Sequence, residues 1–158
     1  MTIQIRQGKP SDIPQVLDLI RELAEYEKAP HEVTVTEEEL LEDGFGKRKL
    51  YDFIVAEEEE QIVGMAFYYP RYSTWKGRTI HLEDFIVKNS HRRYGIGQKL
   101  WDELVRIAAE FGARRLEWVV LNWNEPALEF YRKQEANIDS EWSIGQLTRE
   151  QIEKKVHE

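Results

Sequence analysis

The segment from position 88 to position 97 holds the residues best suited to bind an anion. It reads Lys88-Asn89-Ser90-His91-Arg92-Arg93-Tyr94-Gly95-Ile96-Gly97 and precedes a helical pattern. Glycines at a helix start let a ligand approach the backbone, and the first-turn amides of a helix are unpaired donors with partial positive charge. Basic side chains add to this charge: Lys88, His91, Arg92 and Arg93. A phosphate or diphosphate is therefore the expected ligand.

Three anion-binding patterns compete for this segment. A Walker A loop requires Gly-x-x-x-x-Gly-Lys-Ser/Thr, which the sequence lacks. The dinucleotide pattern Gly-x-Gly-x-x-Gly requires glycine at position 100, which is leucine, and belongs after the first strand. Arg-x-x-Gly-x-Gly remains, as Arg92 to Gly97. Taken alone, this pattern also fits a strand-to-helix turn that carries incidental arginines.

A second chemical candidate is the segment 122–131, Asn-Trp-Asn-Glu-Pro-Ala-Leu-Glu-Phe-Tyr. Asn124 is a good N-cap for a helix, and Tyr131 lies two turns further along. A tyrosine at such a position ordinarily belongs to the core, and Glu83, on an alternating strand pattern, ordinarily faces solvent. In chemical terms a phenol can protonate a leaving group, and a carboxylate can take a proton from an amine.

Hydrophobic periodicity predicts the elements that position these residues. The predicted strands cover 2–6, 53–56, 62–69, 79–87, 116–121 (buried) and, weakly, 138–144. The predicted helices cover 12–28, a short segment capped by Thr36 and ended by Gly44 and Gly46, 95–111, 124–134, and a C-terminal segment capped by Thr148. A hairpin end is expected at the acidic run 57–60, and a turn-rich connection at 71–78. This order predicts an α/β fold, a mixed sheet flanked by helices, in one domain covering 1–158.

Composition restricts the classes of function. The chain has 158 residues, 41% hydrophobic and 33% charged, as in soluble globular proteins. The absence of cysteine excludes disulfides, thiolate zinc sites and a cysteine nucleophile. The net charge of −8 disfavours nucleic acid and anionic membranes and favours a cationic small molecule. We expect a cytoplasmic protein, since no signal-peptide or membrane-spanning pattern is seen, and no metal, since the four histidines lack ligand spacing and are expected at the surface.

Several motifs taken together resemble one family. Besides Arg92–Gly97 and Asn122–Tyr131, they are Glu22–Glu27, Leu41–Gly46, Leu82–Phe85 and Trp123–Pro126. The chain resembles the GNAT acetyltransferases, and within them the spermidine/spermine (diamine) and thialysine acetyltransferase family. The resemblance implies the acyl-CoA N-acyltransferase fold, with a mixed, mostly antiparallel sheet. It also implies acetyl-CoA as co-substrate, direct attack of a primary amine in a ternary complex, and a homodimer, for which the aromatic residues Trp75 and Trp142 are candidate contacts.

The resemblance also implies roles for individual residues. Tyr131 is the implied general acid for the departing thiolate, and Glu83 the implied acid–base group at the amine. The implied acetyl-CoA-binding residues are Phe85, Ile86 and Val87 for the pantetheine arm, Arg92, Arg93, Tyr94, Gly95, Ile96, Gly97 and Gln98 for the diphosphate, and Asn124, Glu125, Pro126 and Ala127 for the thiol end. The implied substrate-binding residues are Tyr26, Glu27, Glu83, Glu117, Trp118 and Val119.

The sequence departs from the family pattern at the end that binds the distal amine. Ser73 replaces an aspartate, Glu135 replaces a glycine and is expected to require a different helix cap, and the segment 137–142 is short, with Asp139 or Glu141 as approximate matches to another acid. A polyamine, a diamine and a lysine-like amino acid therefore stay open as substrates. Two alternative functions are a non-catalytic acyl-CoA-binding module and a protein or peptide N-acetyltransferase.

Overall fold

A computed structural model describes residues 2–158, which form two compact units that divide after Val119. The first unit contains a five-stranded sheet with strand order β1-β2-β3-β4-β5. Its strands are β1 (Gln4–Gln7), β2 (Asp52–Glu58), β3 (Gln61–Ser73), β4 (Gly77–Val87) and β5 (Arg115–Trp118). The strands β1 to β4 pair antiparallel with one another, and β5 runs parallel to β4. The predicted mixed, mostly antiparallel sheet is confirmed.

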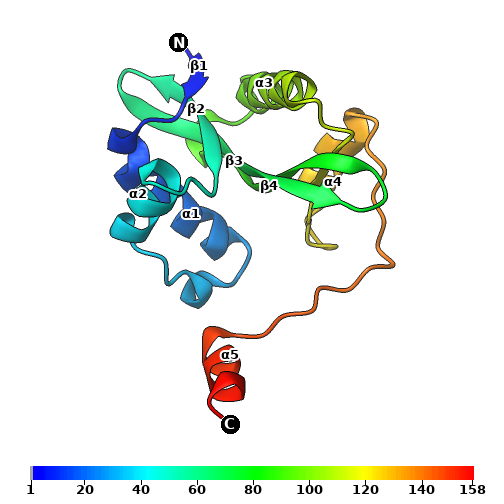
Figure 1. The fold of residues 1–158 in the computed structure, drawn as a ribbon. Helices are drawn as coiled ribbons and strands as arrows, with labels where there is room; N and C mark the ends of the chain where they lie inside the picture. The colour runs from blue at the N-terminus through cyan, green and yellow to red at the C-terminus, as the bar shows by residue number, and fades with distance from the viewer. Residues whose placement is uncertain (1) are drawn as a thin grey trace. The chain divides into compact units, whose positions relative to one another are not determined.

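Helices cover both faces of this sheet (Figure 1). The first unit contains α1 (Ile13–Tyr26), α2 (Glu37–Phe45) and α3 (Ile96–Phe111), together with three short 3-10 turns, η1 (Pro10–Asp12), η2 (Pro30–Glu32) and η3 (Asn89–His91). The second unit contains α4 (Glu125–Lys133) and α5 (Arg149–Val156). The predicted helices all form. Thr36 caps α2 as expected, since its hydroxyl accepts a bond from the Glu39 amide at 3.1 Å.

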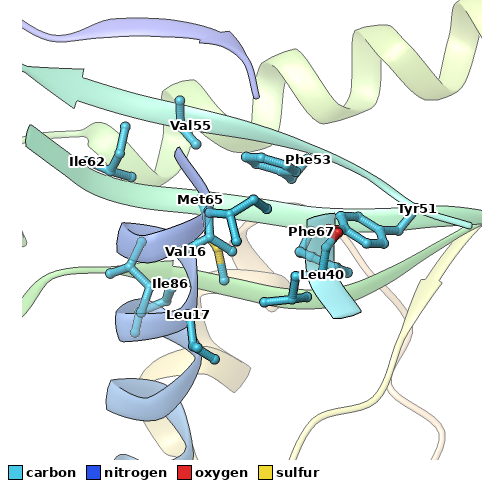
Figure 2. Close-up of a cluster of buried hydrophobic side chains, with 12 residues drawn as sticks. Val16, Leu17, Leu40, Tyr51, Phe53, Val55, Ile62, Met65, Phe67 and Ile86 are labelled. Atoms are coloured by element: carbon cyan, nitrogen blue, oxygen red, sulfur yellow. Dashed lines mark hydrogen bonds between the residues drawn. The ribbon is translucent and has the colours of Figure 1, made fainter. Parts of the chain in front are cut away.

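The core of the first unit lies between α1 and one face of the sheet. Its side chains include Val16 and Leu17 of α1, with Phe53, Met65 and Ile86 from the strands (Figure 2). Because successive strand residues point to opposite faces, the buried neighbours of these strand residues lie on the other face, toward α3. Fully burying a large aliphatic side chain contributes roughly 1.5–3 kcal/mol. Burial on both faces therefore stabilises the sheet and holds α3 against it.

Gly64 lets α3 lie close to β3. A Cβ atom added there would meet the Leu100 side chain of α3 at 3.1 Å and the Ile86 carbonyl at 3.0 Å. A larger residue would require these neighbours to move by a few tenths of an ångström. Since α3 starts at the segment predicted to bind an anion, this close approach helps to set where the N-terminus of the helix lies.

Three predictions about elements are wrong. Gly46 is the C-cap of α2 as predicted, but Gly44 lies inside the helix, where a Cβ would meet the Tyr51 ring at 2.5 Å. The predicted buried strand 116–121 stops at Trp118, its residues are only partly buried, and Val119 is 62% exposed. No strand forms within 138–144, all of which the structure describes. In addition, the connection predicted at 71–78 is mostly strand, with a turn only at 74–76.

Candidate functional site

The segment 88–97, which is predicted to bind an anion, connects the end of β4 to α3. Gly95 is the N-cap of α3 with φ 79°, and Arg93 has φ 71°. Left-handed backbone at two nearby positions makes a tight turn that glycine adopts without strain. No atom lies within 4 Å of where a Cβ on Gly95 would be, so the turn itself, and not crowding, requires glycine. The first-turn amides of this 16-residue helix face the turn.

Arg92 connects this turn to α1. Its Nε donates to the Val87 carbonyl at 3.2 Å, and its guanidinium carbon lies 5.7 Å from the centre of the Tyr26 ring. The geometry is that of a cation–π contact. A residue predicted to bind the cofactor and a residue predicted to bind the substrate are thus in direct contact.

His91 holds the same turn against the β2–β3 hairpin. Its Nε2 lies 2.9 Å from Glu58 Oε1, and its Nδ1 lies 2.8 Å from Ser90 Oγ. The prediction that all four histidines are surface residues is wrong for His91 and His81, whose side chains are 16% and 12% exposed. The predicted hairpin end at 57–60 is confirmed, with Glu59 and Glu60 in the left-handed turn.

β4 carries an irregularity at Glu83. The residue opposite Phe67 is Asp84, and the residue opposite Tyr68 is Leu82, so Glu83 has no opposite partner on β3. An extra residue of this kind is a β-bulge, which bends the strand and redirects side chains next to active sites. Glu83 is consequently 52% exposed while the residues on either side of it are more buried.

The pairing of β4 with β5 also ends at this bulge. It covers only Thr79–Leu82, opposite Arg115–Trp118. Within the part of the chain that the structure describes, the edge of β4 from Glu83 to Val87 has no strand partner on that side. An unpaired edge of this kind can bind an extended ligand through main-chain hydrogen bonds. It contains Phe85, Ile86 and Val87, the residues predicted for the pantetheine arm.

Three carboxyl groups gather near the bulge. Burial, with the nearby charges of Glu83 and Glu27, raises the pKa of Asp84 to about 7. Burial and the charge of Glu83 also raise the pKa of Glu27. The fold therefore brings Glu27, at the end of α1, to the carboxylates of β4. A cation bound among them would relieve their repulsion.

Asp84 belongs to the motif Leu82–Phe85 but has no role among the sequence predictions. The signal was present, because Asp84 lies two positions before Ile86 and so shares its face of the strand, which packs on the core. A charged residue at such a position has to be buried near the core. Its raised pKa follows from that placement.

A network of charged side chains lies beside Glu83. Glu117 of β5 accepts a bond from Arg71, and its Oε1 lies 3.4 Å from His81 Nδ1. The other nitrogen of that imidazole lies 3.7 Å from Glu83 Oε1, and the Tyr69 hydroxyl donates to the same oxygen at 3.3 Å. Two predicted substrate residues, Glu83 and Glu117, are thus joined through one histidine that the sequence did not identify.

Trp118 and Val119 have different surroundings. The Trp118 ring packs edge-on against the Trp101 ring of α3, with centroids 5.2 Å apart. Val119 is mostly exposed and lies at the end of the first unit. Trp118 is therefore positioned mainly by packing.

The second unit holds the remaining predicted site residues. The Asn124 side chain accepts from the Ala127 amide at 3.4 Å, which confirms it as the N-cap of α4. Tyr131 is 7% exposed, and its ring lies 5.7 Å from the Phe130 ring. The role of Tyr131 as general acid stays a prediction.

α4 ends at Lys133, and Glu135, just beyond it, differs from our expectation. Glu135 has φ 63°, and the Ala136 amide donates to the Tyr131 carbonyl at 3.1 Å. This is the left-handed C-terminal cap that glycine favours, adopted here by a glutamate. The glycine is replaced, but the helix keeps the cap geometry that a glycine would give it.

The Acetyltransferase (GNAT) family model matches residues 14–135. The chain therefore belongs to this family and is an acetyltransferase. It is 44% identical over 138 residues to the thialysine N-epsilon-acetyltransferase of Bos taurus, covering 82% of this chain and 81% of that protein. It is 33% identical over 159 residues to the human spermidine/spermine N(1)-acetyltransferase-like protein 1, covering 94% of this chain and 23% of that protein.

A solved structure shares the fold. An aminoglycoside N-acetyltransferase in complex with CoA superposes with a TM-score of 0.73 at 17% identity, covering 94% of this chain and 95% of the other. Among residues 2–158, no group of three or more His, Cys, Asp or Glu side chains is arranged to hold a metal ion. No helix in the described part of the chain is both long and apolar enough to cross a membrane.

Proposed function

We propose that this chain transfers an acetyl group from acetyl-CoA to a primary amine of a small cationic molecule, by direct attack in a ternary complex. The observation that carries the proposal is the arrangement along β4. A turn suited to a diphosphate follows one end of the strand, and clustered carboxyl groups lie at its bulge, with an unpaired edge between them. The cofactor would lie along this edge, and the amine would bind at the carboxylates.

The carboxylates help to produce the neutral amine that the reaction requires. An alkyl amine with a pKa near 10.4 is only about 1 part in 2500 neutral at pH 7, a handicap of roughly 4.6 kcal/mol. The protonated amine cannot attack a thioester. Glu83, exposed at the bulge, binds the ammonium group and then accepts its proton, directly or through water. Asp84 and Glu27 strengthen the local negative potential that attracts the cation.

Acetyl-CoA binds in this proposal through three parts of the chain. The turn Arg93–Gln98 holds the diphosphate, with Arg92 beside it. The β4 edge Phe85–Val87 holds the pantetheine arm. The start of α4, from Asn124 to Ala127, holds the thiol end.

Tyr131 assists the departing thiolate. A thiol with a pKa of about 8.5 is more acidic than a phenol near 10, so complete proton transfer from tyrosine is uphill by roughly 2 kcal/mol. Tyr131 therefore acts mainly as a hydrogen-bond donor to the charge that develops on sulfur. We expect Tyr131→Phe to lower kcat by about 100-fold and to leave acetyl-CoA affinity nearly unchanged. Equal kcat in the variant and the parent protein would remove Tyr131 from the mechanism.

An amine panel tests the proposed function directly. The protein is incubated with acetyl-CoA and polyamines, diamines, lysine-like amino acids, aminoglycosides and a basic peptide, while thiol release and product mass are measured. Amine-dependent thiol release with a product 42 Da heavier is the expected result for small amines. Tight CoA binding without transfer would favour a non-catalytic module, and transfer to the peptide alone would favour a protein acetyltransferase.

Other parts of the proposal concern the whole protein. The comparisons leave a cytoplasmic location, a single functional domain over 1–158 and a homodimer as predictions. Trp75 and Trp142 are 78% and 73% exposed, which suits a contact between copies. Sedimentation of the purified protein measures that association.

A further inference from the structure

Two rows of side chains share one face of the sheet beside Glu83. In one row Arg71 is opposite Thr79, which is opposite Arg115. In the next row Tyr69 is opposite His81, which is opposite Glu117. Residues opposite each other on neighbouring strands point to the same face and interact. Basic side chains from β3, β4 and β5 therefore converge there.

All of these basic groups contact one carboxylate. Arg71 and His81 contact Glu117 Oε1, and Arg115 Nε lies 3.2 Å from Oε2. Two guanidinium groups are always charged, so the single charge of Glu117 leaves one positive charge unbalanced. Glu117, whose side chain is 19% exposed, is already engaged and is not available as a binding group for an ammonium.

Arg71 is the member of this network that can bind something more. Its side chain is 54% exposed, and among residues 2–158 its guanidinium donates only to Glu117. The Arg115 Nε, in contrast, is buried without a hydrogen bond of its own in the described chain. A guanidinium held on one side by a carboxylate presents its other N–H groups in a plane, and this fork matches a second carboxylate.

Arg71 also lies close to the amine-binding carboxylates. Glu117 and Glu83 are separated by the His81 ring alone, with contacts of 3.4 and 3.7 Å. Both Arg71 and Glu83 affect the Tyr69 hydroxyl electrostatically. The site thus has a negative part and, one side chain away, a positive part.

We propose that Arg71 determines substrate specificity by binding a carboxylate of the substrate while Glu83 binds the amine that is acetylated. This inference rests on the proposed function and selects among its substrates. An amino acid with a side-chain amine complements both charges. A polyamine brings a second ammonium toward Arg71, which repels it.

The test compares two substrates that differ at one group, a carboxylate in one and a neutral carboxamide in the other. L-lysine and L-lysinamide have the same chain and both amines, but lysinamide lacks the carboxylate. We expect a higher kcat/KM for lysine with the parent protein. Arg71→Gln should lower kcat/KM for lysine by about 10- to 100-fold, the range for a lost charge-assisted hydrogen bond, and change that for lysinamide less than about threefold. For Arg71→Lys, which keeps the charge, kcat/KM for lysine should lie between the values for the parent protein and for Arg71→Gln.

Controls separate this result from general effects. Arg106→Gln removes an exposed arginine that is paired with Glu103 and Glu110 on α3, and it should leave the lysine-to-lysinamide ratio unchanged. Turnover of 1,5-diaminopentane shows that each Arg71 variant is folded, and it should rise in Arg71→Gln. If Arg71→Gln does not fold, the Arg71→Lys ratio decides the question.

The outcomes are distinct. Equal loss for lysine and lysinamide in Arg71→Gln, or no preference in the parent protein, overturns the role of Arg71 while amine acetylation stands. Turnover of the diamine without turnover of lysine in the parent protein also overturns the role of Arg71 and leaves amine acetylation standing. If the parent protein acetylates no amine at all, the proposed function fails, and this inference fails with it.

Discussion

The turn after β4 and the bulge within β4, which are the diphosphate end and the amine end of the proposed site, are built in different ways. The diphosphate end consists of a short continuous segment, with Gly95 in a left-handed turn before the first turn of α3. The amine end collects side chains from α1, β3, β4 and β5, including Glu27, Arg71 and Glu117. A turn that binds a ligand through its backbone is formed by a few consecutive residues. A site made of charged side chains forms only when several strands of the sheet are paired. Substitutions at the two ends should therefore separate cofactor binding from amine chemistry.

The largest expected effect is at the amine end. We expect Glu83→Gln to lower kcat/KM for amines by about 100- to 1000-fold, because the amide cannot accept the amine's proton. Affinity for CoA, measured by calorimetry, should stay within about twofold. Glu38→Gln, an exposed position on α2, is the matched control. Equal loss of CoA affinity and turnover would contradict the separation of the two ends.

The second effect concerns stability and pH. The pKa of Asp84 is raised to about 7, so its carboxyl binds a proton more tightly in the folded chain than in the unfolded chain. Folding is therefore favoured at low pH, and this contribution is lost as pH rises through about 7. Asp84→Asn should raise the free energy of unfolding by about 2–4 kcal/mol at pH 8 and by much less at pH 4.

Denaturant unfolding at several pH values measures this difference. Asp18→Asn, at an exposed position of α1, should show no such dependence on pH. A gain for Asp84→Asn that is the same at pH 4 and pH 8 would show that the ionised carboxylate is not the cause.

A smaller effect is expected at the diphosphate end. Gly95 has φ 79°, and a left-handed backbone costs a residue with a Cβ about 1–2 kcal/mol. Because the turn of the variant can leave this conformation when no ligand is bound, Gly95→Ala should weaken CoA binding by about 5- to 30-fold, with kcat at saturating cofactor little changed. Gly145→Ala is the control, since it also has open space around its Cβ but no left-handed φ. Unchanged CoA affinity in Gly95→Ala would mean that the turn does not bind the diphosphate.

The smallest effect tests a position outside both ends. Glu135 has the left-handed φ of 63°, so Glu135→Gly should raise the free energy of unfolding by about 1 kcal/mol. Gln134→Gly, at φ −85°, should give no gain. Thermal unfolding compares the two variants. A loss of stability in Glu135→Gly would show that its side chain contributes more than its backbone costs.

Local features of the site could be predicted from the sequence. Asn124 and Thr36 were expected as caps, and both side chains accept the expected amide bonds. The start of α3 at Gly95 was also expected. Each depends on a few consecutive residues, because turns and helix ends are set by short-range hydrogen bonding. The sheet class followed from the order of the elements and from the family resemblance.

Other features required the tertiary structure. The bulge at Glu83 depends on the register of β4 against β3, and the partners of His81 and His91 come from distant strands. The length of β5 was overestimated, because an apolar run does not show where a neighbouring strand stops pairing.

The sequence by itself determined the helices, the caps at Thr36 and Asn124, the turn before α3 and the family. Only the tertiary structure decided that the pKa of Asp84 is raised to about 7 and that Glu117 contacts Arg71 and His81. The physical reason is that charge interactions depend on distance and burial. Distance and burial are set here by strands that are far apart in the sequence but neighbours in the sheet.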